Sequence, residues 1–309
     1  MMRAVRKTIA SLGRIVPLLR LNLAIFSLLP LYLGLVLASG RIWPAGIPGI
    51  GWRWLLGALA CAPAGTGWSY LLNDAFDLED DRLNPRRARS PLVQGRVSRR
   101  EVLLWALVCL ASALALSAFV SKAFFWGVAF MSALSAAYSV PPVRLKIRPG
   151  LDLLTQAFAL GAVRPALGWL IVRPLAEMPW GVPLHFMLAL SGPFLLVMLP
   201  DLPADRARGR RTAAVVLGSR GGVVVSVALV AASFAVLLAM VFFRQVIAPR
   251  FLAYWLALAA IPLPFLPGAW RLRNDPVPLR RHVYRRFVYP AGLGSYALWI
   301  AYLGGWLPA

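Results

Sequence analysis

Carboxylates are scarce in this chain of 309 residues, which has 11 Asp and Glu against 33 Lys and Arg. Only 14% of its residues are charged and 60% are hydrophobic, and this composition excludes an ordinary soluble domain. The two cysteines, Cys61 and Cys109, lie inside apolar runs, where we expect them to pack as small apolar side chains. The two histidines, His185 and His282, form no ligand motif, which argues against a zinc or haem site.

Long apolar runs recur along the whole sequence. Each has about 18 to 22 residues, enough to cross the hydrocarbon core of a bilayer as a helix. Because the runs are continuous and do not alternate, they argue against spanning strands. We predict an all-α, polytopic membrane protein with about nine transmembrane helices, of which the third and fourth form a tight hairpin. We interpret the first run as a retained span and not as a signal peptide. The runs are 21–39, 54–73, 102–120, 124–140, 151–172, 183–200, 221–243, 251–268 and 287–307.

The net charge of +22 is explained by topology and not by nucleic-acid binding. Most basic residues lie in the N-terminal arm and in every second connection between the apolar runs, whereas the other connections contain few. By the positive-inside rule, the N-terminus and the basic connections face the cytoplasm, and an odd number of spans places the C-terminus on the opposite side. We therefore expect a multi-pass protein of the cell membrane, in contact with lipid, with no nucleic-acid partner and no protein partner implied.

Seven of the 11 carboxylates gather in two short windows, each where an apolar run gives way to an arginine-rich stretch. If one helix continues through the first window, Asn73, Asp77 and Asp81 share one of its faces, Asn84 returns to that face, and Asp74 lies at its edge. A stripe of like charges repels itself unless a cation is bound. The two windows comprise Asp74, Asp77, Glu79, Asp80 and Asp81, and then Asp201 and Asp205.

The second window repeats the spacing of the first, with two carboxylates four residues apart. Oxygen ligands of this kind suit Mg²⁺ together with a substrate phosphate. Two such clusters facing each other would hold a diphosphate, and apolar space beside them would suit a hydrocarbon tail, which together describe a prenyl diphosphate. The repeated spacing also hints at a duplicated four-helix unit, helices 1–4 and 5–8, within a single domain of residues 1–309.

Four motifs, in order along the chain, resemble signatures of the UbiA superfamily of intramembrane prenyltransferases. Asn73-Asp74-x-x-Asp77-x-x-x-Asp81-x-x-Asn84 is similar to the first signature of that family. Arg89-Ser-Pro-Leu-x-x-Gly95 and Tyr138-Ser-Val-Pro-Pro-x-x-x-Lys146 resemble two further segments. Asp201-x-x-x-Asp205-x-x-x-Gly209-x-x-Thr212 is similar to the second signature.

The resemblance implies a nine-helix bundle around a central cavity, with Mg²⁺ at its cytoplasmic mouth. The enzyme would transfer an isoprenyl chain from a polyprenyl diphosphate to an acceptor, aromatic or another small or lipid molecule, and release diphosphate. The resemblance implies that the metal ligands are Asn73, Asp77, Asp81, Asp201 and Asp205, with Asp74 as a further member. It implies that Lys146 binds the diphosphate, with Arg82, Arg89 and Arg148 as basic neighbours. It also implies that Tyr138 lies beside the leaving group, and that the catalytic residues are Tyr138, Asp77, Asp81, Asp201 and Asp205.

Five polar residues are candidates for binding the acceptor. Arg164 is the one basic residue well inside an expected span, where it would bind an anionic group. Asp152 and Gln156 begin the same span one turn apart and are placed to line its mouth. Arg20 and Asn22 open the first span, at positions that resemble polar positions of the family. None of the five identifies the acceptor.

Two other functions fit parts of the pattern. A terpene cyclase on the same scaffold would ionise the same diphosphate without an acceptor. A cation-coupled transporter or lipid-binding protein would also use acidic clusters, but it would place them near the middle of the membrane. A phosphotransferase of the CDP-alcohol type requires a DG-x-x-A-R pattern, which the sequence lacks.

Overall fold

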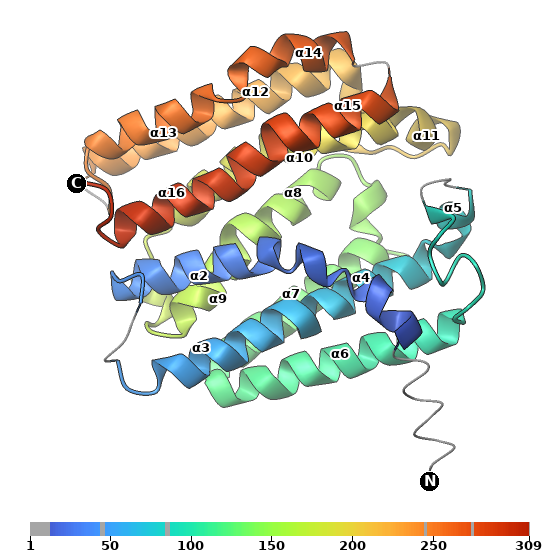
Figure 1. Ribbon diagram of the computed structural model, residues 1–309, viewed down its shortest axis with the longest axis horizontal. Coiled ribbons are helices and arrows are strands. Elements are labelled where there is room, and N and C mark those ends of the chain that lie inside the picture. The colour runs from blue at the N-terminus through green and yellow to red at the C-terminus, as the bar shows by residue number, and fades with distance from the viewer. Residues whose placement is uncertain (1–12, 44–46, 84–86, 244–245, 273–274, 309) are drawn as a thin grey trace. The chain divides into compact units, whose positions relative to one another are not determined.

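The computed structural model describes residues 13–43, 47–83, 87–243, 246–272 and 275–308, and this part of the chain contains helices and no strand. The predicted all-α class is therefore confirmed (Figure 1). The chain divides into two compact units. Unit 1 comprises Met1–Leu28 and Pro48–Arg144, and unit 2 comprises Leu29–Ile47 and Leu145–Ala309. The assignment of residues 1–309 to one domain with an internal repeat stays a prediction.

Unit 1 is built on a long helix that packs against two others. Its core contains Ile15, Leu18, Trp68, Leu71 and Val102, all buried. The long helix consists of α3 (Ile50–Leu59), η2 (Ala60–Ala64) and α4 (Gly65–Phe76), and it packs against α6 (Arg99–Val120) and α7 (Lys122–Ser139). The elements of unit 1 are η1 (Leu21–Leu23), α3 (Ile50–Leu59), the π-helical η2 (Ala60–Ala64), α4 (Gly65–Phe76), α5 (Leu78–Arg82), α6 (Arg99–Val120) and α7 (Lys122–Ser139); α2 (Ile25–Ser39) begins in unit 1 and continues into unit 2.

Serine side chains fix the starts of α6 and α7. The hydroxyl of Ser98 accepts a hydrogen bond from the backbone N–H of Glu101 at 3.1 Å, and Ser121 does the same for Phe124 at 3.1 Å. Such caps satisfy N–H groups that the first turn of a helix leaves unpaired. Since Ser121 alone links α6 to α7, the tight hairpin predicted for the third and fourth apolar runs is present.

Unit 2 has α10 at its centre, packed against α12, α8 and η5. Its core includes an aromatic cluster with Phe186, Phe251, Trp255, Tyr296 and Trp299. The elements are η4 (Leu145–Ile147), α8 (Leu151–Phe158), the π-helical η5 (Ala159–Val163), α9 (Arg164–Leu170), η6 (Leu175–Glu177), α10 (Gly181–Met198), η7 (Leu199–Asp201), α11 (Leu202–Ala207), α12 (Ala213–Phe242), α13 (Arg250–Ala260), η8 (Leu263–Phe265), α14 (Leu266–Arg271), α15 (Pro276–Val283), the π-helical η9 (Tyr284–Leu293) and α16 (Gly294–Leu303).

In the described residues, each of the three π-helical segments contains a proline or is closely followed by one. Pro63 lies inside η2 and Pro290 inside η9, while Pro165 follows η5 by two residues. Proline has no N–H to donate and its ring presses on the carbonyl four residues earlier, so a local widening of the helix relieves both problems. The sequence thus interrupts several of its long helices without ending them.

Helices occupy all nine predicted spans, but the count of nine transmembrane helices is not confirmed. Five helices in the described residues are long and apolar enough to cross a membrane, and a sixth is added if the pair Gly13–Leu23 and Ile25–Ser39, bent by 50°, counts as one span. The five are Ile50–Phe76, Arg99–Val120, Gly181–Ala207, Ala213–Phe242 and Pro249–Arg271. The chain is therefore a multi-pass membrane protein by length and composition of its helices.

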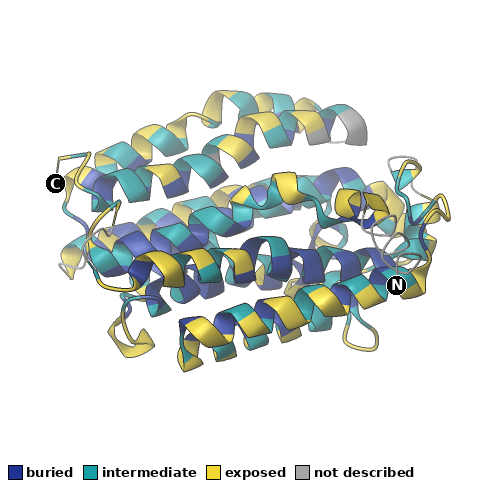
Figure 2. Cartoon of the chain, turned by 60° about the horizontal axis from the view of Figure 1, so that its bottom comes forward, coloured by how far each residue is buried: buried dark blue, intermediate teal, exposed yellow. Residues whose placement is uncertain are grey.

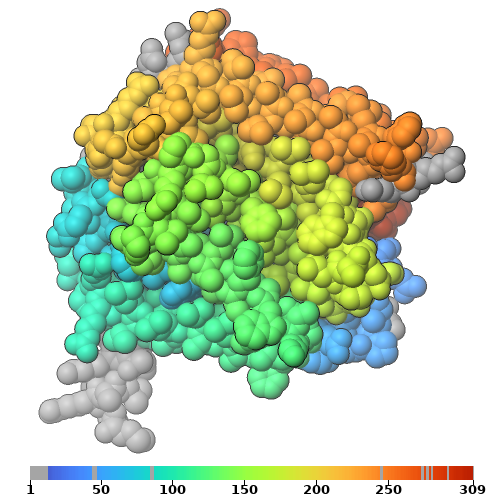
Figure 3. Space-filling model, turned by 180° about the vertical axis from the view of Figure 1, so that it is seen from behind, coloured from blue at the N-terminus to red at the C-terminus, as the bar shows by residue number. Residues whose placement is uncertain are grey.

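Large apolar side chains cover much of the surface of both units. On α6 the buried positions lie three, four or seven residues apart, on one face, while Leu104, Leu107 and Phe119 on the other face are exposed, as the striped colouring of Figure 2 illustrates. In unit 2, exposed residues such as Val224 and Phe242 lie on α12, whose gold side chains reach the surface in Figure 3. A soluble monomer rarely exposes so much apolar surface, whereas a bilayer accommodates it.

Candidate active site

The first acidic window lies at a break between two helices of unit 1. α4 ends at Phe76 and α5 begins at Leu78, with Asp77 between them in a non-helical conformation (φ −101°, ψ 5°). The expectation of one continuous helix is therefore wrong at this residue. Hydrogen bonds still bridge the break, from the N–H of Asp77 to the carbonyl of Asn73 at 2.9 Å and from the N–H of Asp81 to the carbonyl of Asp77 at 2.8 Å. Asn84 lies outside the described residues.

Asp74 is the most deeply buried carboxylate of this window, with 1% of its side chain exposed. Two arginines, Arg20 and Arg87, pair with its Oδ1 atom, while Oδ2 is buried without a hydrogen-bond partner. The sequence placed Asp74 at the edge of the acidic stripe, whereas the fold places it at the centre of an ion-pair network. Burial of an ionised carboxylate is costly, and paired arginines offset that cost.

Arg87 and Arg144 hold the remaining carboxylates of the window. Arg87 donates from Nε to Oδ2 of Asp81 at 2.8 Å, and Arg144 donates from Nη2 to Asp77 at 3.0 Å and to Asp80 at 3.1 Å. Burial acts to lower the pKa of Arg87, but the neighbouring carboxylates of Asp74 and Asp81 outweigh burial and raise that pKa above its ordinary value. The guanidinium is therefore charged at every accessible pH.

The roles of Arg87 and Arg144 were not predicted from the sequence, although both acidic windows are followed there by arginine-rich stretches. A signal was available for Arg144, which lies inside the motif that runs from Tyr138 to Lys146. A stripe of carboxylates also requires a nearby cation, bound metal or guanidinium. Arg20 and Arg144 are the two non-glycine residues with positive φ in the described chain, at 50° and 39°. Strained backbone of this kind often accompanies functional side chains.

Asn73 and Tyr138 complete the described surroundings of the window in unit 1. The hydroxyl of Ser139 donates to Oδ1 of Asn73 at 3.2 Å, which connects the end of α7 to α4. Tyr138 is half-buried near the end of α7. Arg20 also stacks on Tyr70, with its guanidinium carbon 4.7 Å from the ring centroid. The window thus combines carboxylates, one amide and aromatic rings.

The second window forms a turn of helix in unit 2. Asp201 ends η7 and Asp205 lies one turn later in α11, with Pro203 in the first turn of α11. Arg210 pairs with Oδ1 of Asp205 at 3.2 Å, and the hydroxyl of Thr212 donates to Oδ2 at 3.4 Å. The pairing of Asp205 with Arg210 resembles that of Asp81 with Arg87 in the first window, where an arginine from the following segment also binds a carboxylate.

The glycine and threonine of the second motif have structural roles. Gly209 has a φ of +65°, a conformation that side chains with a Cβ rarely adopt, and it turns the chain between α11 and α12. Thr212 caps α12 by accepting a hydrogen bond from the N–H of Val215 at 3.4 Å. The spacing of the motif therefore follows from the turn that returns Thr212 to Asp205.

Asp152 has structural partners in unit 2. It is 1% exposed, and its carboxylate accepts hydrogen bonds from the N–H of Ala213 at 2.7 Å and of Leu153 at 2.9 Å. Asp152 therefore links the starts of α8 and α12. Arg164 is buried at the first position of α9, and Gln156 is half-buried. Acceptor binding by these residues stays a prediction.

The other predicted residues are closer to the surface. Lys146 is half-buried. Arg82 forms an exposed ion pair with Glu79 at 3.0 Å. Asn22, Arg89 and Arg148 are exposed.

The ligand types of the first window fit a hard divalent cation, because they are oxygen atoms of carboxylates and an amide. The unpartnered Oδ2 of Asp74 is one such atom. Among the described residues, however, no three His, Cys, Asp or Glu side chains converge in a way that would hold a metal ion. Arginines occupy the carboxylates instead, so metal binding requires the guanidinium groups to exchange partners.

Comparison with protein families gives a match over most of the chain. The model of the UbiA prenyltransferase family matches residues 27–290. A lycopene elongase/hydratase from Corynebacterium glutamicum is 33% identical over 174 residues, which are 52% of this chain and 56% of that protein. The C50 β-cyclic carotenoid biosynthesis protein of Dietzia sp. strain CQ4 is 35% identical over 179 residues, 55% of this chain and 40% of that protein. The chain thus matches about half the length of these curated relatives.

Solved structures share the fold. A UbiA homologue from Aeropyrum pernix K1 has a TM-score of 0.71 at 24% identity, over 90% of this chain and 98% of that one. A UbiA homologue from Archaeoglobus fulgidus, bound to GPP and Mg²⁺, has a TM-score of 0.69 at 20% identity, over 94% and 98%. These similarities establish the helical architecture of the chain.

Proposed function

This chain belongs to the UbiA prenyltransferase family, and from that premise we propose that it is a membrane enzyme that transfers an isoprenyl chain from a polyprenyl diphosphate to an apolar acceptor. The observation that carries the proposal is the network of carboxylates and arginines at the break between α4 and α5. Four carboxylates, Asp74, Asp77, Asp80 and Asp81, are paired there with arginines. This combination suits binding of a metal–diphosphate complex.

Charge balance supports an exchange of partners on substrate binding. When a divalent cation takes over the carboxylates, Arg20, Arg87 and Arg144 become available for a diphosphate, which carries several negative charges. Guanidinium groups bind phosphate oxygens in forked pairs of hydrogen bonds. The arginines and carboxylates of the network are thus interpreted as groups that satisfy one another and that exchange partners when metal and diphosphate bind.

We assign metal binding to both acidic motifs. In the first, Asn73, Asp77 and Asp81 supply ligands, with Asp74 as a further oxygen donor. In the second, Asp201 and Asp205 do so. Bound Mg²⁺ would supply stabilisation of the negative charge that develops on the leaving diphosphate. This assignment is supported by the oxygen-rich ligand sets and by the UbiA homologue that was solved with GPP and Mg²⁺.

In the proposed reaction, the allylic carbon–oxygen bond of the substrate breaks and diphosphate leaves with the electron pair. A double bond of the acceptor then supplies the electrons for the new carbon–carbon bond. The resulting cation of the acceptor then loses a proton to water, or adds a water molecule that releases one proton to the solvent, and either step restores its neutral state. Lys146, with Arg82, Arg89 and Arg148, is proposed to bind the diphosphate, and Tyr138 to lie beside the leaving group.

The names of the curated relatives direct the choice of acceptor. Those proteins are named for lycopene elongation or hydration and for C50 carotenoid biosynthesis. We therefore propose a long, acyclic polyene as the first acceptor to test, ahead of aromatic compounds. Asn22, Asp152, Gln156 and Arg164, with Arg20 when it does not bind the diphosphate, are the candidate contacts for a polar acceptor, because a hydrocarbon polyene offers no polar group for them to bind.

The charge pattern of the connections supports an orientation in the cell membrane. We propose that the N-terminus and both acidic windows face the cytoplasm, with the C-terminus on the opposite side. Water-soluble prenyl diphosphates would then reach the windows from the cytoplasm. Labelling of single introduced cysteines from each side of the membrane tests this orientation.

Turnover of labelled prenyl diphosphates by the purified protein tests the function. The substrates are prenyl diphosphates of several lengths, each with lycopene, with an aromatic acceptor or with no acceptor, and with Mg²⁺ or EDTA. We expect Mg²⁺-dependent release of diphosphate together with a prenylated acceptor. A cyclised product without acceptor would favour a terpene cyclase, and the absence of diphosphate release under all conditions would refute the transferase.

A further inference from the structure

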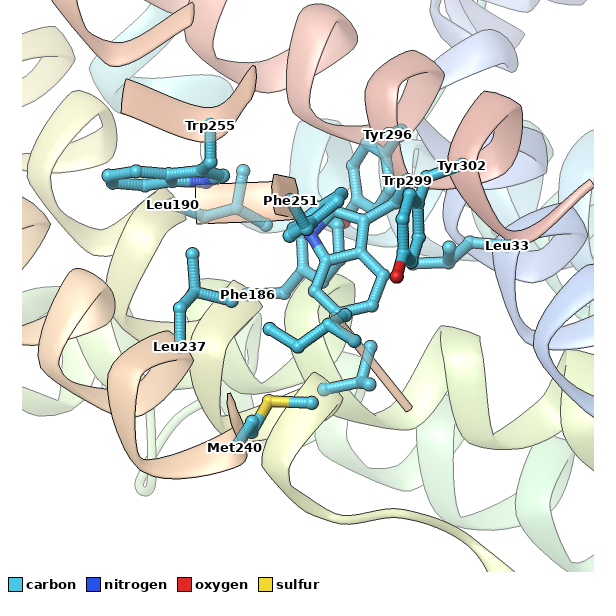
Figure 4. Close-up of a cluster of buried hydrophobic side chains, with 12 residues drawn as sticks. Leu33, Phe186, Leu190, Leu237, Met240, Phe251, Trp255, Tyr296, Trp299 and Tyr302 are labelled. Carbon is cyan, nitrogen blue, oxygen red and sulfur yellow. The ribbon is translucent and has the colours of Figure 1, made fainter. Parts of the chain in front are cut away.

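Three ring nitrogen atoms in the core of unit 2 are buried without a hydrogen-bond partner. They are Nε2 of His185 and Nε1 of Trp255 and Trp299. The centroid of the His185 ring lies 5.5 Å from that of Trp255 and 5.8 Å from that of Trp299. Figure 4 shows the two indoles, from α13 and α16, with the nitrogen of each on the side of the ring that faces the other. Three unsatisfied polar atoms therefore gather in one small region.

The other polar groups of the structure indicate that this gathering is specific. Buried Trp68 and Trp169 donate from their indole nitrogens to backbone carbonyls, at 3.0 and 2.9 Å. Within the cluster itself, the hydroxyl of Tyr296 donates to the carbonyl of Leu160 at 2.9 Å, and that of Tyr302 accepts from a backbone N–H at 2.7 Å. Since buried polar groups are nearly always satisfied, three unsatisfied ring nitrogens in one aromatic cluster point to a bound group that the protein chain itself does not supply.

The contacts of His185 fix which atoms donate and which accept. Its Nδ1 lies 3.1 Å from the backbone carbonyl of Ser233, which can only accept, so Nδ1 carries the hydrogen. His185 is fully buried among apolar side chains, where a charged ring would be costly. In the neutral ring, Nε2 is therefore an acceptor. The cluster offers two donors, on Trp255 and Trp299, and one acceptor.

We propose that His185, Trp255 and Trp299 form a binding site for one hydroxyl group. The hydroxyl oxygen accepts hydrogen bonds from both indoles and donates its hydrogen to Nε2 of His185. A carbonyl oxygen has no hydrogen to donate, and an ammonium group cannot accept from the indoles, so neither fits the set. Two nitrogens that share one oxygen at about 2.9 Å lie within about 6 Å of each other, a span compatible with the ring separations.

The hydroxyl belongs either to a water molecule or to the end of a lipid-soluble alcohol. Buried waters typically make about three hydrogen bonds, as this site allows. An alcohol would reach the site from the bilayer beside α13, on which Leu256, next to the buried Trp255, is exposed. His185, Trp255 and Trp299 have no role in the proposed transferase reaction, so the proposed hydroxyl site does not depend on that reaction.

Nuclear magnetic resonance of the full-length protein in micelles tests the site. Tryptophan is labelled with ¹⁵N, and substitution of Trp255, Trp299 or Trp169 by Phe assigns the three indole signals. In the unchanged protein we expect the indole protons of Trp255 and Trp299 to show cross-peaks to a bound hydroxyl, and that of Trp169 to show none. Cross-peaks that follow the water resonance identify water, and cross-peaks to methylene protons after addition of 1-dodecanol identify an alcohol.

Two substitutions at one position test the role of the acceptor. His185→Phe removes Nε2 and is expected to abolish the cross-peaks at both indoles, whereas His185→Gln, which keeps one donor and one acceptor, is expected to retain them. Absence of cross-peaks from Trp255 and Trp299 in the unchanged protein, with water and with 1-dodecanol, would overturn the proposal. This outcome does not depend on whether the two His185 variants fold.

Discussion

Replacement of Arg87 tests whether the ion-pair network stabilises unit 1. Arg87→Gln removes a guanidinium that binds both Asp74 and Asp81. The side chain of Asp74 is 1% exposed and that of Arg87 is 25% exposed, so the pair is largely withdrawn from water. Loss of one partner of a fully buried pair costs about 3–5 kcal/mol. Because Arg20 continues to pair with Asp74 and Arg87 is partly solvated, we expect a loss of about 2 kcal/mol.

Arg82→Gln is the matched control, because it removes the same charge from the same region. Arg82 pairs with Glu79 at 3.0 Å, but the two side chains are 55% and 81% exposed. Such surface pairs contribute about 0–1 kcal/mol. Titration with SDS in mixed micelles, without metal or diphosphate and followed by tryptophan fluorescence, should show a shift of about 30-fold in the unfolding equilibrium for Arg87→Gln, as 2 kcal/mol implies. Equal stabilities of the two variants would refute the argument from burial.

Two further predictions concern the proposed metal site and the packing of unit 2. Asp77→Asn and Asp201→Asn should each lower turnover by about a hundredfold or more. If both residues act on one diphosphate, the double variant should lose little more turnover than either single variant. Losses of turnover that multiply in the double variant would indicate independent roles. Gly168→Ala should destabilise the protein, since its new Cβ would lie 1.8 Å from the carbonyl oxygen of Leu31, whereas Gly51→Ala, with nothing within 4 Å, should stabilise its helix slightly. Thermal unfolding that shifts equally in both glycine variants would contradict the close helix packing.

The sequence predicted the architecture in its general form because the signals for a membrane helix are local. An apolar run of sufficient length predicts a helix wherever it lies along the chain. The number of spans was less secure. Prolines such as Pro63, Pro165 and Pro290 occur in helices that continue through π-helical segments, which periodicity alone does not reveal.

The carboxylates of the candidate site were predicted from the sequence, whereas the arginines that pair with them were not. Asp74, Asp77 and Asp81 are conspicuous in a chain with so few acidic residues, and their spacing could be read directly. Their partners could not, because Arg20 is 54 residues from Asp74 and Arg144 is 67 residues from Asp77. With 33 basic residues in the chain, proximity in sequence did not single out these two.

The sequence by itself determined that this protein is a helical membrane protein of one family, with two acidic motifs at the ends of apolar helices. These properties follow from composition, from the length of the apolar runs and from residue order. Tertiary structure alone decided that Asp74 is buried between arginines, that Asp152 joins the starts of α8 and α12, and that His185 meets Trp255 and Trp299. Each of these contacts joins segments far apart in the chain, so it depends on how the helices pack and not on local sequence.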